Sequence, residues 1–320
     1  MTQAPQAPAL LDRHAFLYSV VIPVYNSEKF VGRTVDEVVR TFREAGLRLE
    51  LVLVNDGSPD DVWPVLEAKA AEYDEVVAVN LLRNYGQHTA NVAGFAESTG
   101  DYVITMDDDL QNPPDQALVL IDKAMEGYDC VFARFEQKQA AGYRRLGSKV
   151  IGMMNRNIFG QPPDLVVTNF RILRRDVVDR IVASRTAHPY ITGQALLYSS
   201  HRANAVVRHQ ARAEGTSNYS FTRILKLVFT ILFSYSSWPL RTLAAIGFGV
   251  AGLAFVIGTV YLLLGLLGQI SVPGWTTLIV LLSIFNGFTI AMLSMLGEYL
   301  VRTLNAVSAT ETFHVKAKAP

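Results

Sequence analysis

The chain has 320 residues with 29 basic and 29 acidic side chains, so its formal net charge is zero. This balance excludes a strongly basic chain, so no overall positive charge argues for nucleic-acid binding, and we expect no nucleic-acid partner. The single cysteine, Cys130, excludes an intramolecular disulfide; it stands in an apolar run and is interpreted as a packed strand residue. Half of the residues are apolar, and the stretch from Leu243 to Leu296 contains no Asp, Glu, Lys or Arg.

The N-terminal segment, residues 1–16, is predicted to be flexible. Its first residues are rich in Ala and Pro and show neither the basic region nor the long apolar core of a signal peptide. We therefore expect the domain that follows to stay in the cytoplasm.

Residues 17–215 are predicted to form one catalytic domain in which short β-branched runs alternate with helical patterns. Strands are expected at 18–22, 50–54, 76–80, 102–106 and 129–132, and helices at about 27–45, 62–73 and 86–98. This alternation predicts an α/β fold with a mostly parallel sheet and helices on both faces. Ligands of such sheets bind beyond the carboxyl ends of the strands.

Polar sequences follow the first four of these strands. They are Pro23-Val24-Tyr25-Asn26, Asn55 to Asp60, Arg83 to His88, and Asp107 to Pro114. Each alone is compatible with turn chemistry, because Asn, Asp, Gly and Pro fill loops for backbone reasons. Their convergence on one sheet edge favours a binding site.

The three adjacent aspartates after the fourth strand carry the most chemistry. Neighbouring carboxylates repel one another, so their placement there is costly unless a cation compensates. In an extended segment Asp107 and Asp109 point to the same side and Asp108 to the opposite side. Such a pair offers hard oxygen ligands for Mg²⁺ or Mn²⁺. A solvated acidic turn is the alternative.

Residues 216–240 show apolar side chains at helical spacing with basic residues among them. This pattern is typical of a helix lying in the membrane interface, and equally of an amphipathic helix packed on the catalytic domain.

Two apolar stretches without charges follow, Leu243–Gly268 and Gly274–Gly297. Each exceeds the roughly 20 residues that span a bilayer, whereas core helices of soluble proteins nearly always show a polar face. Arg241 precedes the first stretch, and Glu298 and Arg302 follow the second. The positive-inside rule then predicts a two-span hairpin with both termini in the cytoplasm and residues 301–320 as a cytoplasmic tail.

These motifs together resemble the family 2 glycosyltransferases of the GT-A fold. Within that family the chain is similar to the branch of dolichyl-phosphate mannose synthases and undecaprenyl-phosphate sugar transferases. The signature is a strand followed by Asp-x-Asp-Leu-Gln-x-Pro-Pro, matched by Asp107 to Pro114. The resemblance covers nearly the whole chain, including the C-terminal pair of apolar stretches.

The resemblance implies roles for particular residues. Donor binding would fall to Pro23, Tyr25, Asn26, Asp56 and Arg134. Asp107 would contact the nucleotide or sugar, while Asp109 and Gln111 would ligate the Mg²⁺ or Mn²⁺ that bridges the diphosphate. The family's His-x-x-Arg element is matched by His209 and Arg212, where Arg212 would grip phosphate. An exposed surface pair is the alternative for these last two residues.

Three positions depart from the branch. Ser27 stands where Glu is frequent, and Asn218 stands where a Lys often follows the serine. Asn169 replaces the aspartate of an Asp-Phe-Arg element and cannot serve as a general base.

The implied activity is inverting transfer of a sugar from a UDP- or GDP-linked donor to a polyprenyl phosphate. A phosphate acceptor is largely deprotonated near pH 7, its second pKa being about 6, and needs little help from a base. Arg144, Arg145 and Lys149 begin a helical run and are candidates for binding the acceptor phosphate; a solvated basic helix face is the alternative.

Two other functions stay open at this point. One is transfer to a sugar hydroxyl of a polysaccharide or lipid-linked oligosaccharide, and the other is a non-catalytic, nucleotide-sugar-binding membrane scaffold. The glycines between Gly247 and Gly258 allow close helix packing, either within one hairpin or between copies in a homo-oligomer.

Overall fold

The computed structural model describes most of the chain. The described residues are 10–135, 142–184, 186, 189–208, 228, 229, 231, 232, 234–236, 238–267, 274–308 and 312–320. The chain divides into two compact units. Unit 1 comprises residues 1–220 with 309–320, and unit 2 comprises residues 221–308.

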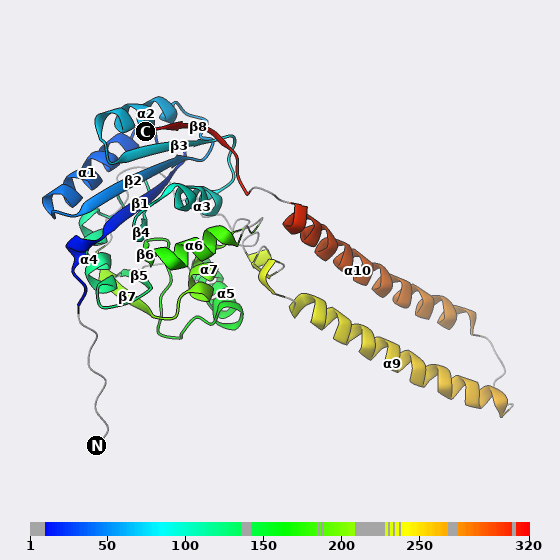
Figure 1. Ribbon diagram of the computed structural model, residues 1–320. Coiled ribbons are helices and arrows are strands. Elements are labelled where there is room, and N and C mark those ends of the chain that lie inside the picture. The colour runs from blue at the N-terminus through cyan, green and yellow to red at the C-terminus, as the bar shows by residue number, and fades with distance from the viewer. Residues whose placement is uncertain are drawn as a thin grey trace, which may run out of the picture. The chain divides into compact units, whose positions relative to one another are not determined.

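In its described part, unit 1 contains an eight-stranded sheet of order β7-β5-β6-β4-β1-β2-β3-β8 (Figure 1). The strands are β1 Leu17–Val24, β2 Arg48–Asn55, β3 Val76–Leu81, β4 Tyr102–Thr105, β5 Cys130–Phe135, β6 Arg171–Arg174, β7 Arg202–Val207 and β8 Val315–Ala319. Strands β4, β1, β2 and β3 are mutually parallel neighbours, whereas β6 and β8 run antiparallel to the strands beside them.

Seven α-helices accompany this sheet in its described part. They are α1 Val31–Glu44, α2 Val62–Glu72, α3 Gln87–Glu97, α4 Asp115–Ala124, α5 Gly142–Phe159, α6 Arg175–Ala183 and α7 Ile191–Tyr198. Helices α1, α2, α3, α4 and α6 pack directly on its strands, and α5 and α7 pack on other helices. The apolar side chains of α1, α2 and α4 join one buried cluster with alternate residues of β1 and β2. Helix α3 packs on the opposite face, where a Cβ added to Gly94 would lie 2.3 Å from Val21 Cγ1. Only glycine allows the helix to approach the sheet so closely.

The predicted α/β sheet with flanking helices is confirmed, and each predicted strand and helix overlaps an observed one. Helix α1 begins at Val31, later than residue 27, because the Ser27 carbonyl accepts hydrogen bonds from the N–H groups of Phe30 and Val31 in a preceding turn. Strands β6, β7 and β8 were not predicted. The last of these lies in the segment expected to be a tail.

Unit 2 contains two long helices, α9 Trp238–Leu266 and α10 Trp275–Ser308. They pack closely at Gly247, where an added Cβ would lie 2.9 Å from Phe288 Cε1. Among the described residues, length and composition make one segment, Ile284–Val301, suitable to cross a membrane, with a mean hydropathy of 1.4. Helix α10 extends beyond the predicted Gly297 to Ser308.

Candidate active site

The polar sequences after β1, β2, β3 and β4 lie at one edge of the sheet. These strands are parallel neighbours, so their carboxyl ends are adjacent. Val24 at the end of β1 pairs with Asn55 at the end of β2, and the Asp56 N–H donates to the Val24 carbonyl at 3.0 Å. The parallel pairing of β1 and β2 therefore brings together the residues of these two strand ends that were predicted to bind the nucleotide-sugar donor.

Asp56 clamps the loop that follows β3. The side chain is only 3% exposed, and its two carboxylate oxygens accept hydrogen bonds from the N–H groups of Tyr85 (2.7 Å) and Gly86 (2.9 Å). Burial raises the pKa of Asp56, and the two N–H donors oppose that rise. The neighbouring Gly57 has φ +59°, and a Cβ there would lie 2.3 Å from the Arg83 carbonyl carbon. The β2 and β3 loops are thus in direct backbone contact.

The loop after β1 is tied to the loop after β2. Asn26 has a left-handed φ of 58°, a conformation that Asn tolerates better than most residues, and its N–H donates to Ser58 Oγ at 2.7 Å. Ser58 in turn donates its hydroxyl to Asp60, which also accepts from the Glu28 N–H at 3.0 Å. Beside these contacts Tyr25 is 49% exposed, so its ring is accessible to a ligand.

The acidic loop after β4 turns sharply. Leu110 has φ 56°, which is strained for a branched side chain, and Asp109 Oδ1 accepts from the Gln111 N–H at 3.1 Å. Asp108 accepts a hydrogen bond from the Ser27 hydroxyl. Burial chiefly, with repulsion from Asp107 and Asp109, raises the pKa of Asp108 to about 6.

The Ser27–Asp108 contact explains one departure from the branch. Ser27, at a position where relatives often carry Glu, donates to the neighbouring carboxylate. A Glu at this position would place a second carboxylate against Asp108 and repel it. Serine at position 27 avoids this repulsion, because its hydroxyl group donates a hydrogen bond to Asp108.

Asp107 is held by a row of amides. Gln87 at the start of α3 donates Nε2–H to Asp107 Oδ1 at 2.7 Å, and Asn169 donates Nδ2–H to Gln87 Oε1 at 3.5 Å. The backbone carbonyl of Asn169 accepts from the Thr105 hydroxyl, which fixes the start of β6 against β4. The hydrogen bonds in this row run in one direction, because Asn169 donates to Gln87 and Gln87 donates to Asp107. Asn169 is therefore a hydrogen-bond donor, whereas an ionised aspartate at this position could only accept a hydrogen bond.

A buried cation lies close to this row. Arg171 is fully buried and donates to Thr192 Oγ1 at 2.9 Å and to Thr105 Oγ1 at 3.3 Å. Burial lowers the pKa of Arg171 to about 10, and the charge of Asp107 acts in the opposite direction. Burial, aided by the Arg171 charge, lowers the pKa of His88 to about 4, so this imidazole is neutral at physiological pH.

The other predicted site residues are placed as follows. Arg134 is exposed near the carboxyl end of β5, which runs parallel to β4 because both are antiparallel to the intervening β6. It therefore lies at the ligand edge, two strands from Asp107. Arg144, Arg145 and Lys149 fall in α5, in a part whose side chains are not described.

The His-x-x-Arg element, His209 and Arg212, lies outside the described residues. The residue just before it, Arg208, is tied to the helix that follows the acidic loop. Its Nη2 lies 2.5 Å from Asp115 Oδ2, and its N–H donates to Gln116 Oε1 at 2.9 Å. The end of β7 is thus anchored to the first turn of α4.

The acidic loop has the chemistry of a divalent-cation site. The described residues contain no group of three or more His, Cys, Asp or Glu side chains positioned to hold a metal. A Mg²⁺ ion, however, is usually held by one or two carboxylates together with substrate phosphates. Asp107, Asp109 and the amide oxygen of Gln111 offer that donor set, so the residues present fit such an ion.

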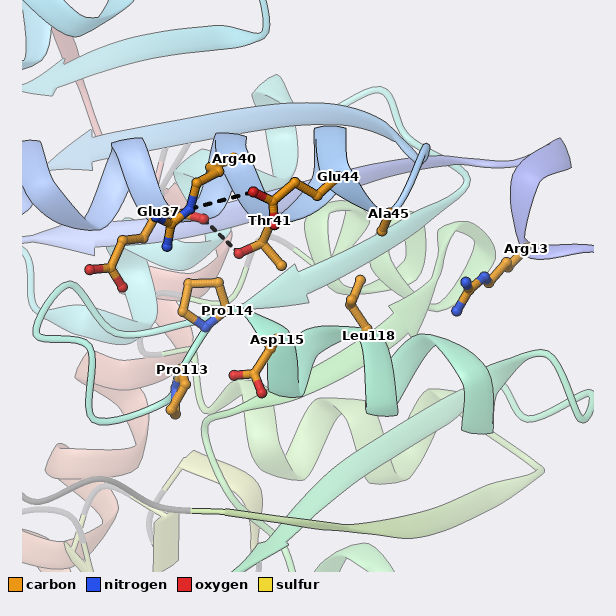
Figure 2. Close-up of a pocket in the computed structure, with 10 residues that line it drawn as sticks. All are labelled: Arg13, Glu37, Arg40, Thr41, Glu44, Ala45, Pro113, Pro114, Asp115 and Leu118. Carbon is orange, nitrogen blue, oxygen red and sulfur yellow. Dashed lines mark hydrogen bonds and ion pairs between the residues drawn. The ribbon is translucent and has the colours of Figure 1, made fainter.

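A separate groove of about 550 Å³ lies between α1 and α4 (Figure 2). Its walls carry charged side chains, including Glu37, Arg40 and Glu44 of α1, and Arg40 lies 4.0 Å from Glu44. It meets the acidic loop only through Pro113 and Pro114 and contains none of the predicted donor residues. The groove is therefore distinct from the candidate active site.

Sequence reasoning missed the roles of Gln87, Asn169 and Ser27. Gln87 stands in the third polar sequence, Arg83 to His88, which was predicted to lie at the ligand-binding edge of the sheet. The partner of Gln87, Asp107, is 20 positions away, and spacing alone does not pair a helix start with another strand's end.

A mostly parallel sheet, with an acidic loop after β4 and a loop after β3 that Asp56 holds in place, is the arrangement expected of a glycosyltransferase domain. The family model described as "Glycosyl transferase family 2" matches residues 19–182, and the chain belongs to this family. The family predicted from the sequence motifs is confirmed.

The chain is similar over nearly its whole length to proteins named undecaprenyl-phosphate 4-deoxy-4-formamido-L-arabinose transferase. The relative from Shewanella sediminis is 36% identical over 301 residues, covering 93% of this chain and 91% of the relative. The relative from Pseudomonas aeruginosa strain LESB58 is 36% identical over 304 residues, covering 94% and 89%.

The fold is also similar to that of a solved structure. A crystal structure of glucosyl-3-phosphoglycerate synthase from Mycobacterium tuberculosis, in complex with Mn²⁺, UDP-glucose and phosphoglyceric acid, has a TM-score of 0.53. It is 18% identical and covers 73% of this chain and 84% of its own. At this identity the likeness supports the shared fold.

Proposed function

We propose that this glycosyltransferase moves a sugar from a nucleotide-sugar to a polyprenyl phosphate. The observation that carries the proposal is the similarity over 93% of the chain to relatives named as undecaprenyl-phosphate sugar transferases. The candidate active site supports it, because the acidic loop and the clamped loops are intact at the ligand edge of the sheet.

The donor nucleotide would bind over the carboxyl ends of β1 and β2. Tyr25 offers an exposed ring for stacking, and Asp56 orders the loop after β3 while retaining acceptor lone pairs. Pro23 and Asn26 shape the same edge. Arg134, exposed at the end of β5, would supply a positive charge for the diphosphate.

Asp109 and Gln111 would hold a Mg²⁺ or Mn²⁺ ion against the donor diphosphate. When bound, such an ion neutralises the charge that develops on the leaving diphosphate. Asp107, oriented by Gln87, would face the nucleotide or the sugar. A solved structure of the same fold contains both Mn²⁺ and UDP-glucose, which supports binding of a divalent cation together with a nucleotide-sugar.

The acceptor phosphate explains why the site can work without an aspartate at position 169. A phosphate oxygen is already ionised near pH 7 and can attack the anomeric carbon directly, with inversion and departure of the nucleoside diphosphate. Cations are needed to hold the dianion, and we assign Arg144, Arg145, Lys149 and Arg212 to this task. A sugar hydroxyl would instead need a base, and Asn169 cannot be one.

A lipid acceptor requires a membrane-bound enzyme, and we propose that α9 and α10 form a two-span hairpin with the catalytic domain and both termini in the cytoplasm. Between Trp238 and Leu266 helix α9 carries a single charged side chain, Arg241, near its start. The Ile284–Val301 segment of α10 has a mean hydropathy of 1.4 with one charged residue, Glu298, and is unburied. Close packing at Gly247 would stabilise the hairpin, and Gly249 and Gly252, where an added Cβ would meet nothing within 4 Å, leave room for a second copy.

The test is a transfer assay with the full chain purified in detergent, undecaprenyl phosphate, Mg²⁺ or Mn²⁺, and a panel of radiolabelled UDP- and GDP-sugars. We expect one donor to carry label into the organic phase, and EDTA to prevent this. If no donor in the panel carries label into the lipid phosphate, the proposal is wrong.

A further inference from the structure

The C-terminal residues form part of the catalytic sheet. Strand β8 pairs antiparallel with β3, with Asn80 opposite Ala317 and Val79 opposite Lys318 (Figure 1). The Leu82 N–H donates to the His314 carbonyl at 2.9 Å, one residue beyond the end of β3. On the face that carries α3, Lys318 Nζ lies 2.7 Å from Glu97 Oε2.

Two buried asparagine side chains, Asn55 and Asn80, connect β3 to the loop after β2. Asn55 Nδ2–H donates to Asn80 Oδ1 at 3.0 Å, and Asn55 Oδ1 accepts the Ser58 N–H at 3.0 Å. The two asparagines are 4% and 7% exposed. Ser58 Oγ accepts the Asn26 N–H, so the row reaches the loop after β1 as well. The loops after β1 and β2 are thus linked to Asn80 of β3 through Ser58 and Asn55.

A second connection runs along the backbone. Leu82, which β8 holds through its N–H, is followed by the loop whose Tyr85 and Gly86 N–H groups bind Asp56. An unpaired strand edge opens locally at low free energy, whereas a strand paired on both sides is protected. Without β8, β3 would be the edge strand, and this loop would start from a fraying end.

We propose that residues 314–319 are a positioning segment of the donor site. Their pairing with β3 holds Asn80 in place, which positions Asn55 and Ser58 in the loop after β2. The same pairing holds Leu82, which positions the loop whose N–H groups bind Asp56. Both loops would contact a nucleoside diphosphate. The inference rests on the proposed function only for the identity of that ligand.

The experiment compares the full chain with a variant that ends at Glu311. The matched control inserts ten Gly and Ser residues after Ala309, which lengthens the connection but leaves β8 intact. UDP and GDP binding with Mn²⁺ and the hydrogen exchange of the Ser58, Tyr85 and Gly86 amides are measured. We expect truncation to weaken nucleotide binding about tenfold and to speed exchange of these amides, and the insertion to change neither. Unchanged binding and exchange after truncation would overturn the inference.

A second pair of variants decides the matter if the truncated chain loses protection throughout unit 1. Lys318→Glu places two carboxylates together, and we expect it to weaken nucleotide binding; adding Glu97→Lys restores the ion pair and should restore binding. Unchanged binding in Lys318→Glu, or no recovery when Glu97→Lys is added, would contradict the inference.

These readouts are independent of sugar transfer. A full chain that binds nucleotide but transfers nothing to lipid phosphate would contradict the proposed function and leave the role of β8 standing. A chain that transfers sugar normally after loss of β8 would contradict the role of β8 and leave the proposed function standing.

Discussion

Replacing Asn169 by aspartate tests the role assigned to the amide row. A simple view of the family holds that aspartate at this position is a base, so Asn169→Asp would raise activity. The structure predicts the opposite, because Asn169 donates to Gln87 Oε1, and Gln87 donates to Asp107. An ionised carboxylate at position 169 has no hydrogen to donate. If the Gln87 carboxamide rotates by half a turn to donate to that carboxylate, its oxygen faces the Asp107 carboxylate, and two acceptors then repel each other.

The cost follows from the distances. The two contacts of 3.5 and 2.7 Å, with the width of a carboxamide between them, separate the carboxylates by at most about 8 Å. At an effective dielectric constant of about 20, two charges at that distance repel by about 2 kcal/mol. Loss of one hydrogen bond adds about 1 kcal/mol. About 3 kcal/mol corresponds to roughly a hundredfold loss in kcat/KM for the donor.

The assay measures kcat/KM for the nucleotide-sugar at saturating lipid phosphate, from pH 5 to pH 8. Asn169→Ala is the matched control; it loses the hydrogen bond without gaining a charge, and we expect a loss of about fivefold. The deficit of Asn169→Asp relative to the parent should shrink toward pH 5, where a protonated carboxyl group at position 169 can donate again. If Asn169→Asp equals or exceeds the parent chain at pH 8, the amide row does not orient Asp107 and the base interpretation gains support.

Four further predictions can be tested on the same preparation. Asp109→Asn should abolish turnover while the protein stays folded and membrane-bound, and normal activity would refute the metal assignment. Replacing Arg144 and Arg145 by Ala should raise the KM for lipid phosphate more than the KM for the donor; equal effects would remove them from the acceptor site. The folded pKa of His88 is about 4, below its ordinary 6.5, so the unfolded chain binds the extra proton between these values. Stability should therefore fall by up to about 3 kcal/mol as pH drops from 6.5 to 4, and chemical denaturation of His88→Gln should lack that slope. Gly94→Ala places a methyl group 2.3 Å from Val21 Cγ1 and should lower the free energy of unfolding by about 1–3 kcal/mol; an unchanged unfolding midpoint would contradict the close approach of α3.

Local sequence pattern determined much of this protein. Alternating strand and helix signals predicted the parallel core of the sheet, because side-chain periodicity is a property of each segment by itself. The polar sequences after Val24, Asn55 and Leu81, and the Asp107–Pro114 signature, were assigned to one edge because parallel strands place their carboxyl ends together. That contiguous signature predicted the family, and the family model that matches residues 19–182 confirms it.

Tertiary structure decided what depends on residues far apart in the chain. No local signal says that β6 enters between β4 and β5, or that residues 315–319 return to pair with β3. The same holds for the Gln87–Asp107 and Asn55–Asn80 hydrogen bonds, which exist only because strand order brings separate loops within reach. A short strand such as Val315–Ala319 gains its stability from an edge that offers unpaired N–H and C=O groups. That edge forms only when the rest of the sheet has folded.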